Sequence, residues 1–102
     1  MRDNISREEF SNSVNSKFKL KLDESSSLDL EMVTFEDLGS TARQDQFSLV
    51  FRGPVAPILP QTVCRLEHDV IGSFDIFLVP VGRDSLGVYY EAIFNRFPEQ
   101  TP

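Results

Sequence analysis

The stretch "FDIFLVPVG", Phe74 to Gly82, decides how this chain folds. It has the composition of an extended strand, in which successive side chains point to opposite faces of a sheet. One face would carry Phe74, Ile76 and Leu78, and the other would carry Asp75, Phe77, Val79 and Val81. An antiparallel sheet with one face in water normally has a polar outer face. This strand is apolar on both faces, so its second face needs a cover.

The segments on either side of this stretch predict an antiparallel meander. "TVCRLE" (62–67) precedes it and "VYYEAIFN" (88–95) follows it, and each connector is five residues long and ends in Gly, a suitable hairpin length. These lengths predict a register with the pairs Arg65–Asp75, Leu66–Phe74, Cys64–Ile76, Ile76–Phe94, Phe77–Ile93, Leu78–Ala92 and Val79–Glu91. Pro80 lacks an N–H group, which predicts a bulge or a gap in the ladder.

The rest of the chain adds further strands and one helix. "KFKLKL" (17–22) alternates cleanly, "LDLEMVTFEDL" (28–38) changes phase near Val33 as a bulge would require, and "FSLVFRG" (47–53) alternates again. The proline-rich stretch 54–60 is a connection. We therefore expect one mainly β (α+β) domain over 1–102: a short N-terminal helix (6–15), then a bent antiparallel sheet or small open barrel of about six strands (16–96), and a tail (97–102).

The expected helix has a clear start signal. Ser6 and Glu9 have the spacing of a capping box, and Phe10 and Val14 fall on one helix face. Three covers fit the second apolar face of the meander. The helix could lie on it through Phe10 and Val14, the other strands could curl over it, or a partner could dock on it.

Composition limits the classes of partner. The 102 residues carry a net charge of −6, which disfavours binding to nucleic acid and to anionic membranes. Cys64 is the only cysteine, so no internal disulfide forms. The chain opens without a secretory signal and has no apolar run of membrane-spanning length, which leads us to expect a cytoplasmic protein with no membrane partner.

Candidate chemistry is sparse. His68 lies between Glu67 and Asp69, but neighbours on a strand point to opposite faces, and Cys64 is too distant along the strand to pair with His68. A histidine that caps a strand or bonds in a turn is the simpler interpretation. The sequence has no phosphate loop, nucleophile elbow or metal-ligand spacing. We therefore predict no enzyme activity, no cofactor and no metal.

A binding function is the leading hypothesis. The expected strand-addition site combines a sheet edge with the second apolar face, and its candidate residues are Phe77, Val79, Tyr89, Glu91 and Ile93, with Lys17, Lys19 and Lys21 on a strand expected to be an edge. The expected partner is a peptide or protein segment. The alternative is a structural or assembly subunit that forms a homodimer through the outer face.

The C-terminal half also carries a long ordered string, "FSLVFRGP…LPQTVCRLEH…GSFDIFLVPVG…YEAIFNR", over residues 47–96. It resembles a family of small bacterial proteins with an LEH…FLVPVG…YEAxFN signature and no established activity. The chain is also similar to the non-catalytic peptide-binding proteins of crocagin-type (pyrroloindoline) ribosomal peptide pathways. That resemblance implies binding of a precursor peptide beside the modifying enzymes, and it assigns no individual binding residue.

Overall fold

The computed structural model describes residue 2, residues 5–39, residue 41 and residues 43–97. Its elements are α1 (Arg7–Ser11), β1 (Lys17–Lys21), β2 (Ser27–Asp37), β3 (Asp45–Gly53), β4 (Thr62–His68), β5 (Gly72–Asp84) and β6 (Gly87–Arg96). The fold is mostly β with one short helix, as predicted. All of the expected tail except Phe97, which is exposed, lies outside the described residues.

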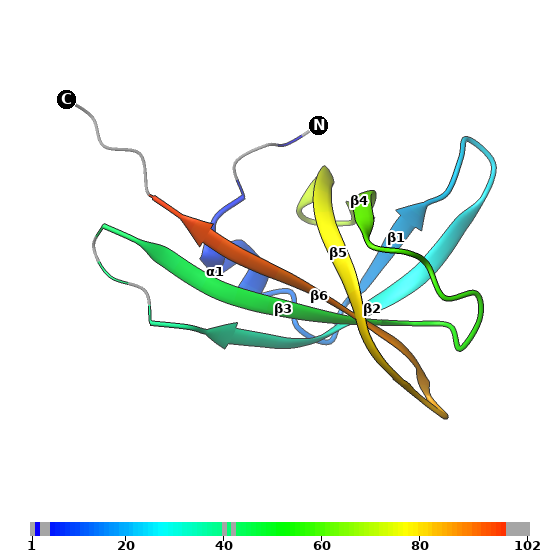
Figure 1. Ribbon diagram of the computed structural model, residues 1–102. Coiled ribbons are helices and arrows are strands. Elements are labelled where there is room, and N and C mark those ends of the chain that lie inside the picture. Colours follow the sequence, from blue (N-terminus) through cyan, green and yellow to red (C-terminus); the bar gives the residue numbers. More distant parts are fainter. Residues whose placement is uncertain (1, 3–4, 40, 42, 98–102) are drawn as a thin grey trace.

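The six strands form one antiparallel sheet that closes on itself in the order β1-β2-β3-β6-β5-β4 (Figure 1). Closure comes from the pairing of β1 with β4, for example Leu20 with Leu66. The sheet is therefore a closed ring, where the sequence predicted a bent sheet or an open barrel. β1 has a neighbour on each side, so the prediction that the lysine-bearing strand is an edge was wrong.

Alternate residues of every strand point into the ring and form the core. The inward side chains are almost fully buried, and they are Phe18, Leu20, Leu30, Met32, Phe47, Leu49, Phe51, Cys64, Leu66, Phe74, Ile76, Leu78, Val88, Tyr90 and Ala92. This period of two is the one that the sequence alternation predicted. Cys64 lies in this core as expected, and burial raises the pKa of its thiol.

Two irregularities also fall where the sequence placed them. The β2–β3 register shifts between Met32 and Thr34, which matches the phase change at Val33. The β5–β6 register shifts between Pro80 and Gly82, which matches the bulge expected at the proline. Bulges bend a strand and increase its twist, and such bending helps a short sheet to close.

Helix α1 begins with the predicted capping box. Ser6 is the N-cap, its side chain accepts a hydrogen bond from the Glu9 N–H group, and the Glu9 carboxylate accepts one from the Ser6 N–H group. The helix ends at Ser11 and is thus shorter than the predicted 6–15. Arg7 ties the helix to the sheet through ion pairs with Asp37 and Asp45, each at 3.0 Å.

The helix packs against the inner side of the sheet and leaves the outer face uncovered. Phe10 is 1% exposed, and its ring lies 5.9 Å from that of Phe47, 5.8 Å from that of Phe74 and 5.3 Å from that of Phe94. All three partners belong to the inward-facing rows of β3, β5 and β6. The first of the three covers considered from sequence, a helix over Phe77 and Val79, is therefore wrong. In the described part of the chain, no helix has the length and apolarity needed to cross a membrane.

Candidate functional site

The candidate site is a gap in the ring between β5 and β6. The two strands pair only near their shared hairpin, from Asp84–Gly87 to Val79–Glu91. Beyond Val79, β5 follows β4, and beyond Glu91, β6 follows β3, so the two strands diverge (Figure 1). The predicted pair Val79–Glu91 is confirmed. The pairs predicted further along, including Phe77–Ile93, are not formed.

Backbone geometry shows which groups point into this gap. The carbonyl of Ser73 accepts a hydrogen bond from the Arg2 N–H group at 2.7 Å, on the side of β5 away from β4. Because the backbone groups of a strand alternate in direction, those of Asp75 and Phe77 point to the same side as those of Ser73. On β6, Glu91 pairs with Val79, so the backbone groups of Glu91 point toward β5. Because the direction alternates along a strand, the backbone groups of Ile93 and Asn95 also point toward β5.

Apolar side chains flank the gap on the outer surface. Phe77 on β5 is 50% exposed, and Ile93 on β6 is 66% exposed. Val63 on β4 lies directly opposite Phe77 and is 62% exposed. We call Val63, Phe77 and Ile93 the outer strip. Its members are separate from the core, which faces the inside of the ring.

A small cavity lies on the inner side of the gap. It measures about 120 Å³ and is lined by Arg2, Ile5, Phe10, Phe74, Asp75, Phe94 and Arg96. The lining thus comes from the N-terminal segment, the helix and both diverging strands. Sequence analysis missed Arg2, Ile5 and Arg96, because a contact between the first residues of the chain and β5 or β6 leaves no local pattern.

The other predicted site residues occupy different places. Val79 and Glu91 face each other where the gap begins, and Glu91 forms no ion pair within the described part of the chain. Two arginines of β3 and β6 bond elsewhere: Arg52 pairs with Glu31, and Arg96 pairs with Asp45. Tyr89 lies nearer the hairpin.

Tyr89 has a local role in that hairpin. Its hydroxyl donates a hydrogen bond to Asp84 at 2.9 Å, which raises the pKa of the phenol. The pKa of the Asp84 carboxyl is lowered first by the Leu86 N–H group and then by this hydroxyl. The backbone N–H groups of Leu86 and Gly87 also donate to Asp84. The structure therefore separates Tyr89 from the gap and assigns it to the turn.

The predicted lysines are also separate from the gap. Lys17, Lys19 and Lys21 lie on β1, and β4 separates β1 from β5. Lys19 lies 3.9 Å from Asp29, an exposed ion pair of the kind that contributes little to stability. The three lysines form a row on the outside of the ring.

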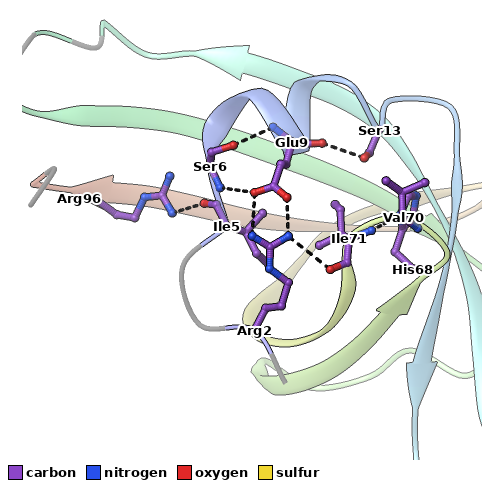
Figure 2. Close-up of polar contacts among 9 residues, drawn as sticks. All are labelled: Arg2, Ile5, Ser6, Glu9, Ser13, His68, Val70, Ile71 and Arg96. Carbon is purple, nitrogen blue, oxygen red and sulfur yellow. Dashed lines mark hydrogen bonds and ion pairs between the residues drawn. The ribbon is translucent and has the colours of Figure 1, made fainter.

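His68 is a turn residue, as its simpler interpretation predicted. Its Nδ1 atom accepts hydrogen bonds from the N–H groups of Val70 and Ile71, both at 3.1 Å (Figure 2). Its Nε2 atom lies 2.8 Å from Ser16 Oγ, which itself donates to the carbonyl of Ser13. These bonds select the neutral ring with the proton on Nε2. Desolvation lowers the pKa of His68, and the nearby Asp69 carboxylate partly opposes that shift.

Metal-binding geometry is not found at His68 or elsewhere among the described residues, where no three His, Cys, Asp or Glu side chains are grouped to hold an ion. What the described site offers is two strand edges, an apolar strip outside them and a small cavity inside them. That arrangement suits recognition of an extended chain.

Comparison with known proteins places this geometry in a family. Residues 5–94 match the family described as a domain of unknown function (DUF6916), a span that covers most of the 102 residues and all six strands up to Phe94. No curated protein and no solved structure matches the chain significantly. The chain therefore belongs to the DUF6916 family.

Proposed function

We propose that this chain is a non-catalytic peptide-binding module, and that it receives an extended segment as an added strand at the gap between β5 and β6. One observation carries the proposal: the two strands part beyond Val79 and Glu91, and each directs backbone groups toward the other across the gap. Unsatisfied strand edges recruit extended chains, because main-chain hydrogen bonds then form in a row.

A second observation supports the use of this edge. Arg2 forms a parallel bridge with Phe74 on β5, so backbone of the same chain already pairs with this edge at one residue. Phe77 and Ile93 would then provide the apolar anchors for the side chains of a bound peptide. Binding by strand addition draws affinity from the main chain and specificity from such flanking side chains.

The natural source of the peptide is part of the proposal. On the resemblance to crocagin-type pathway proteins, we propose a ribosomally made precursor peptide, which the module would hold beside the modifying enzymes. Strand addition does not depend on that source. It requires only a segment that can extend and that carries apolar side chains in alternate positions.

Display selection followed by backbone methylation tests the proposal. Short peptides selected on the immobilised protein are synthesised, and their binding is measured by calorimetry. The winning peptide is then N-methylated at one residue at a time, which removes one backbone donor per variant. Loss of binding at successive positions supports pairing with both edges, and loss at every second position supports pairing with one edge.

Retained binding by all methylated variants would contradict strand addition. Peptides that bind only through side chains at a distant surface would leave the amide NMR signals of Phe77 and Ile93 unchanged, and that outcome also counts against the proposal. Sedimentation at several concentrations tests the alternative. A tight dimer that buries Phe77 and Ile93 would instead assign the outer strip to a second copy of the chain.

A further inference from the structure

The N-terminal segment, in which Arg2 and Ile5 are the described residues, contacts both strands that flank the candidate gap. The Arg2 N–H group donates to the Ser73 carbonyl at 2.7 Å, and Arg2 bridges Phe74 in parallel. These are main-chain contacts of the kind that an incoming strand would make with β5. The first part of this edge is thus satisfied from within the same chain.

The same segment is also fixed to β6, on the other side of the gap. Ile5 is 5% exposed, and its carbonyl accepts a hydrogen bond from Arg96 Nη1 at 2.7 Å (Figure 2). Arg96 belongs to β6 and also pairs with Asp45 of β3. Arg2 and Ile5 therefore hold the segment to both diverging strands, and both residues line the cavity between them.

An exposed ion pair holds Arg2 in place. Its guanidinium makes a two-point contact with the Glu9 carboxylate: Nη1 meets Oε1, and Nη2 lies 3.0 Å from Oε2 (Figure 2). Nη1 also lies 3.4 Å from the Ile71 carbonyl. The Arg2 and Glu9 side chains are 40% and 36% exposed, so water can replace their contact at little cost. The ion pair itself can open without disturbance of the core, whereas release of the whole segment also removes Ile5 from the core cluster.

We propose that the N-terminal segment is an internal competitor for the gap, and that a bound peptide takes its place on β5. This inference rests on the proposed peptide-binding function and describes the regulation of the same site. The parallel bridge between Arg2 and Phe74 also sets a direction. A peptide that replaces the segment runs parallel to β5 and, because β5 and β6 are antiparallel, antiparallel to β6.

Competition has a measurable consequence for affinity. The apparent dissociation constant rises when only a fraction of the protein has its site open. Loss of the Arg2–Glu9 contact increases that fraction, so Arg2→Ala is expected to bind the display-selected peptide about two- to fivefold more tightly, as for the loss of one exposed ion pair. Arg83→Ala is the matched control, since Arg83 lies on the β5–β6 hairpin, in the paired part of the two strands away from the gap.

The test measures two quantities on the full-length protein. Calorimetry compares the affinity of the selected peptide for wild type, Arg2→Ala and Arg83→Ala. NMR follows the methyl signal of Ile5, which aromatic rings of the core should shift in the free protein. Displacement predicts tighter binding only in Arg2→Ala, together with movement of the Ile5 signal toward its value in an unfolded chain as the peptide saturates the site.

The other results distinguish a failure of displacement from a failure of peptide binding. Peptide binding with an unmoved Ile5 signal and equal affinity in all three proteins would overturn displacement and leave peptide binding intact. Weaker binding by Arg2→Ala would make Arg2 part of the peptide site, which also overturns competition. Binding by Arg2→Ala alone would support both proposals, and the absence of saturable binding in all three proteins would overturn both.

Discussion

Val79 on β5 and Glu91 on β6 form the last pair of their ladder before the two strands diverge. The bulge between Pro80 and Gly82 lies next to this pair and increases the local twist of β5. From Leu78 back to Gly72, β5 then pairs with β4 and, at Phe74, with Arg2, while β6 continues along β3. The gap on which the proposed function depends thus begins next to a bulge in one hairpin.

The outer strip should control peptide affinity and leave stability unchanged. Phe77→Ser and Ile93→Ser remove exposed anchors beside the gap, so each is expected to weaken binding of the selected peptide by about 1 kcal/mol or more, roughly fivefold. Substitutions of exposed side chains usually alter stability by only about 0.5 kcal/mol. Calorimetry and thermal unfolding measure the two effects.

Leu86→Ser is the control for this prediction. Leu86 is 69% exposed but lies in the β5–β6 turn, away from the gap. Equal losses of affinity in all three variants would show that general surface apolarity, and not the strip, governs binding.

Sequence reasoning succeeded where interactions are local. The register of β4 and β5, with Arg65 opposite Asp75, followed from the length of one short connector and is confirmed. The capping box at Ser6 and the bulges near Val33 and Pro80 followed from residue types within a few positions of each other. Alternation correctly grouped Phe74, Ile76 and Leu78 on one face of β5, because the side-chain period is fixed by the backbone.

Prediction failed where segments far apart in the sequence meet. Alternation tells which face a residue occupies but does not tell which strand lies beside it, so the pairing of β3 with β6 and that of β1 with β4 were missed. Close to the turn the β5–β6 register differs from the predicted one by one residue, with Gly82 opposite Tyr89 and Arg83 opposite Val88. The bulge between Pro80 and Gly82 restores the predicted register at Val79–Glu91, and the ladder ends there, so Phe77–Ile93 does not form. The amphipathic pattern of α1 likewise could not tell the inside of the ring from the outside.

A pair of glycine substitutions tests the close approach between β3 and β6. A Cβ atom on Gly87 would lie 2.1 Å from the carbonyl oxygen of Gly53, whereas a Cβ atom on Gly82 would have no neighbour within 4 Å. Gly87→Ala should therefore lower the free energy of unfolding by about 1–3 kcal/mol, because two backbones must separate. Gly82→Ala should be neutral or stabilising by at most about 1 kcal/mol. Urea unfolding measures both, and similar values for the two variants would contradict the close approach.

Phe10 should be the main energetic link between the helix and the sheet. Its ring is 1% exposed and contacts three inward-facing phenylalanines, so Phe10→Ala is expected to cost about 3–5 kcal/mol through lost burial and a new cavity. Phe97→Ala is the control, because Phe97 is 74% exposed. Urea unfolding curves give the comparison. If Phe10→Ala left the free energy of unfolding unchanged, the helix would not be packed on the core in solution.

The carboxyl of Glu9 should report the Arg2 contact directly. Hydrogen bonds from the Arg2 guanidinium and then from the Ser6 N–H group lower the pKa of Glu9 to about 2 from an ordinary 4.5. The stabilisation of the folded state by these hydrogen bonds to Glu9 is therefore fully present above pH 4.5 and is lost as the pH falls toward about 2. Carbon-13 NMR titration of the side-chain carboxyl measures the midpoint. In Arg2→Ala the midpoint should rise, since the larger cause is removed, and an unchanged midpoint would show that the two side chains are apart in solution.

His68 should make the stability of the ring fall in mildly acidic solution. Its Nδ1 atom accepts two N–H groups from Val70 and Ile71, so a proton on Nδ1 would face two donors and open the turn. The pKa of His68 is lower in the folded state than its ordinary 6.5, and the unfolded chain therefore takes up the proton first. The contribution of His68 to the free energy of unfolding is therefore fully present above pH 6.5 and declines as the pH falls below 6.5.

The variant His68→Asn, which has no titrating ring, tests this pH effect. The cavity beside His68 is also lined by the charged side chains of Lys17, Lys19, Asp29, Glu67 and Asp69. His68→Asn keeps an acceptor for the turn without a titrating ring, since Asn side chains accept the N–H group two residues onward. Urea unfolding should show a loss of stability between pH 7.5 and 5.5 in wild type and a smaller loss in His68→Asn. Equal losses would mean that the pH dependence comes from other groups and that the turn tolerates a protonated ring.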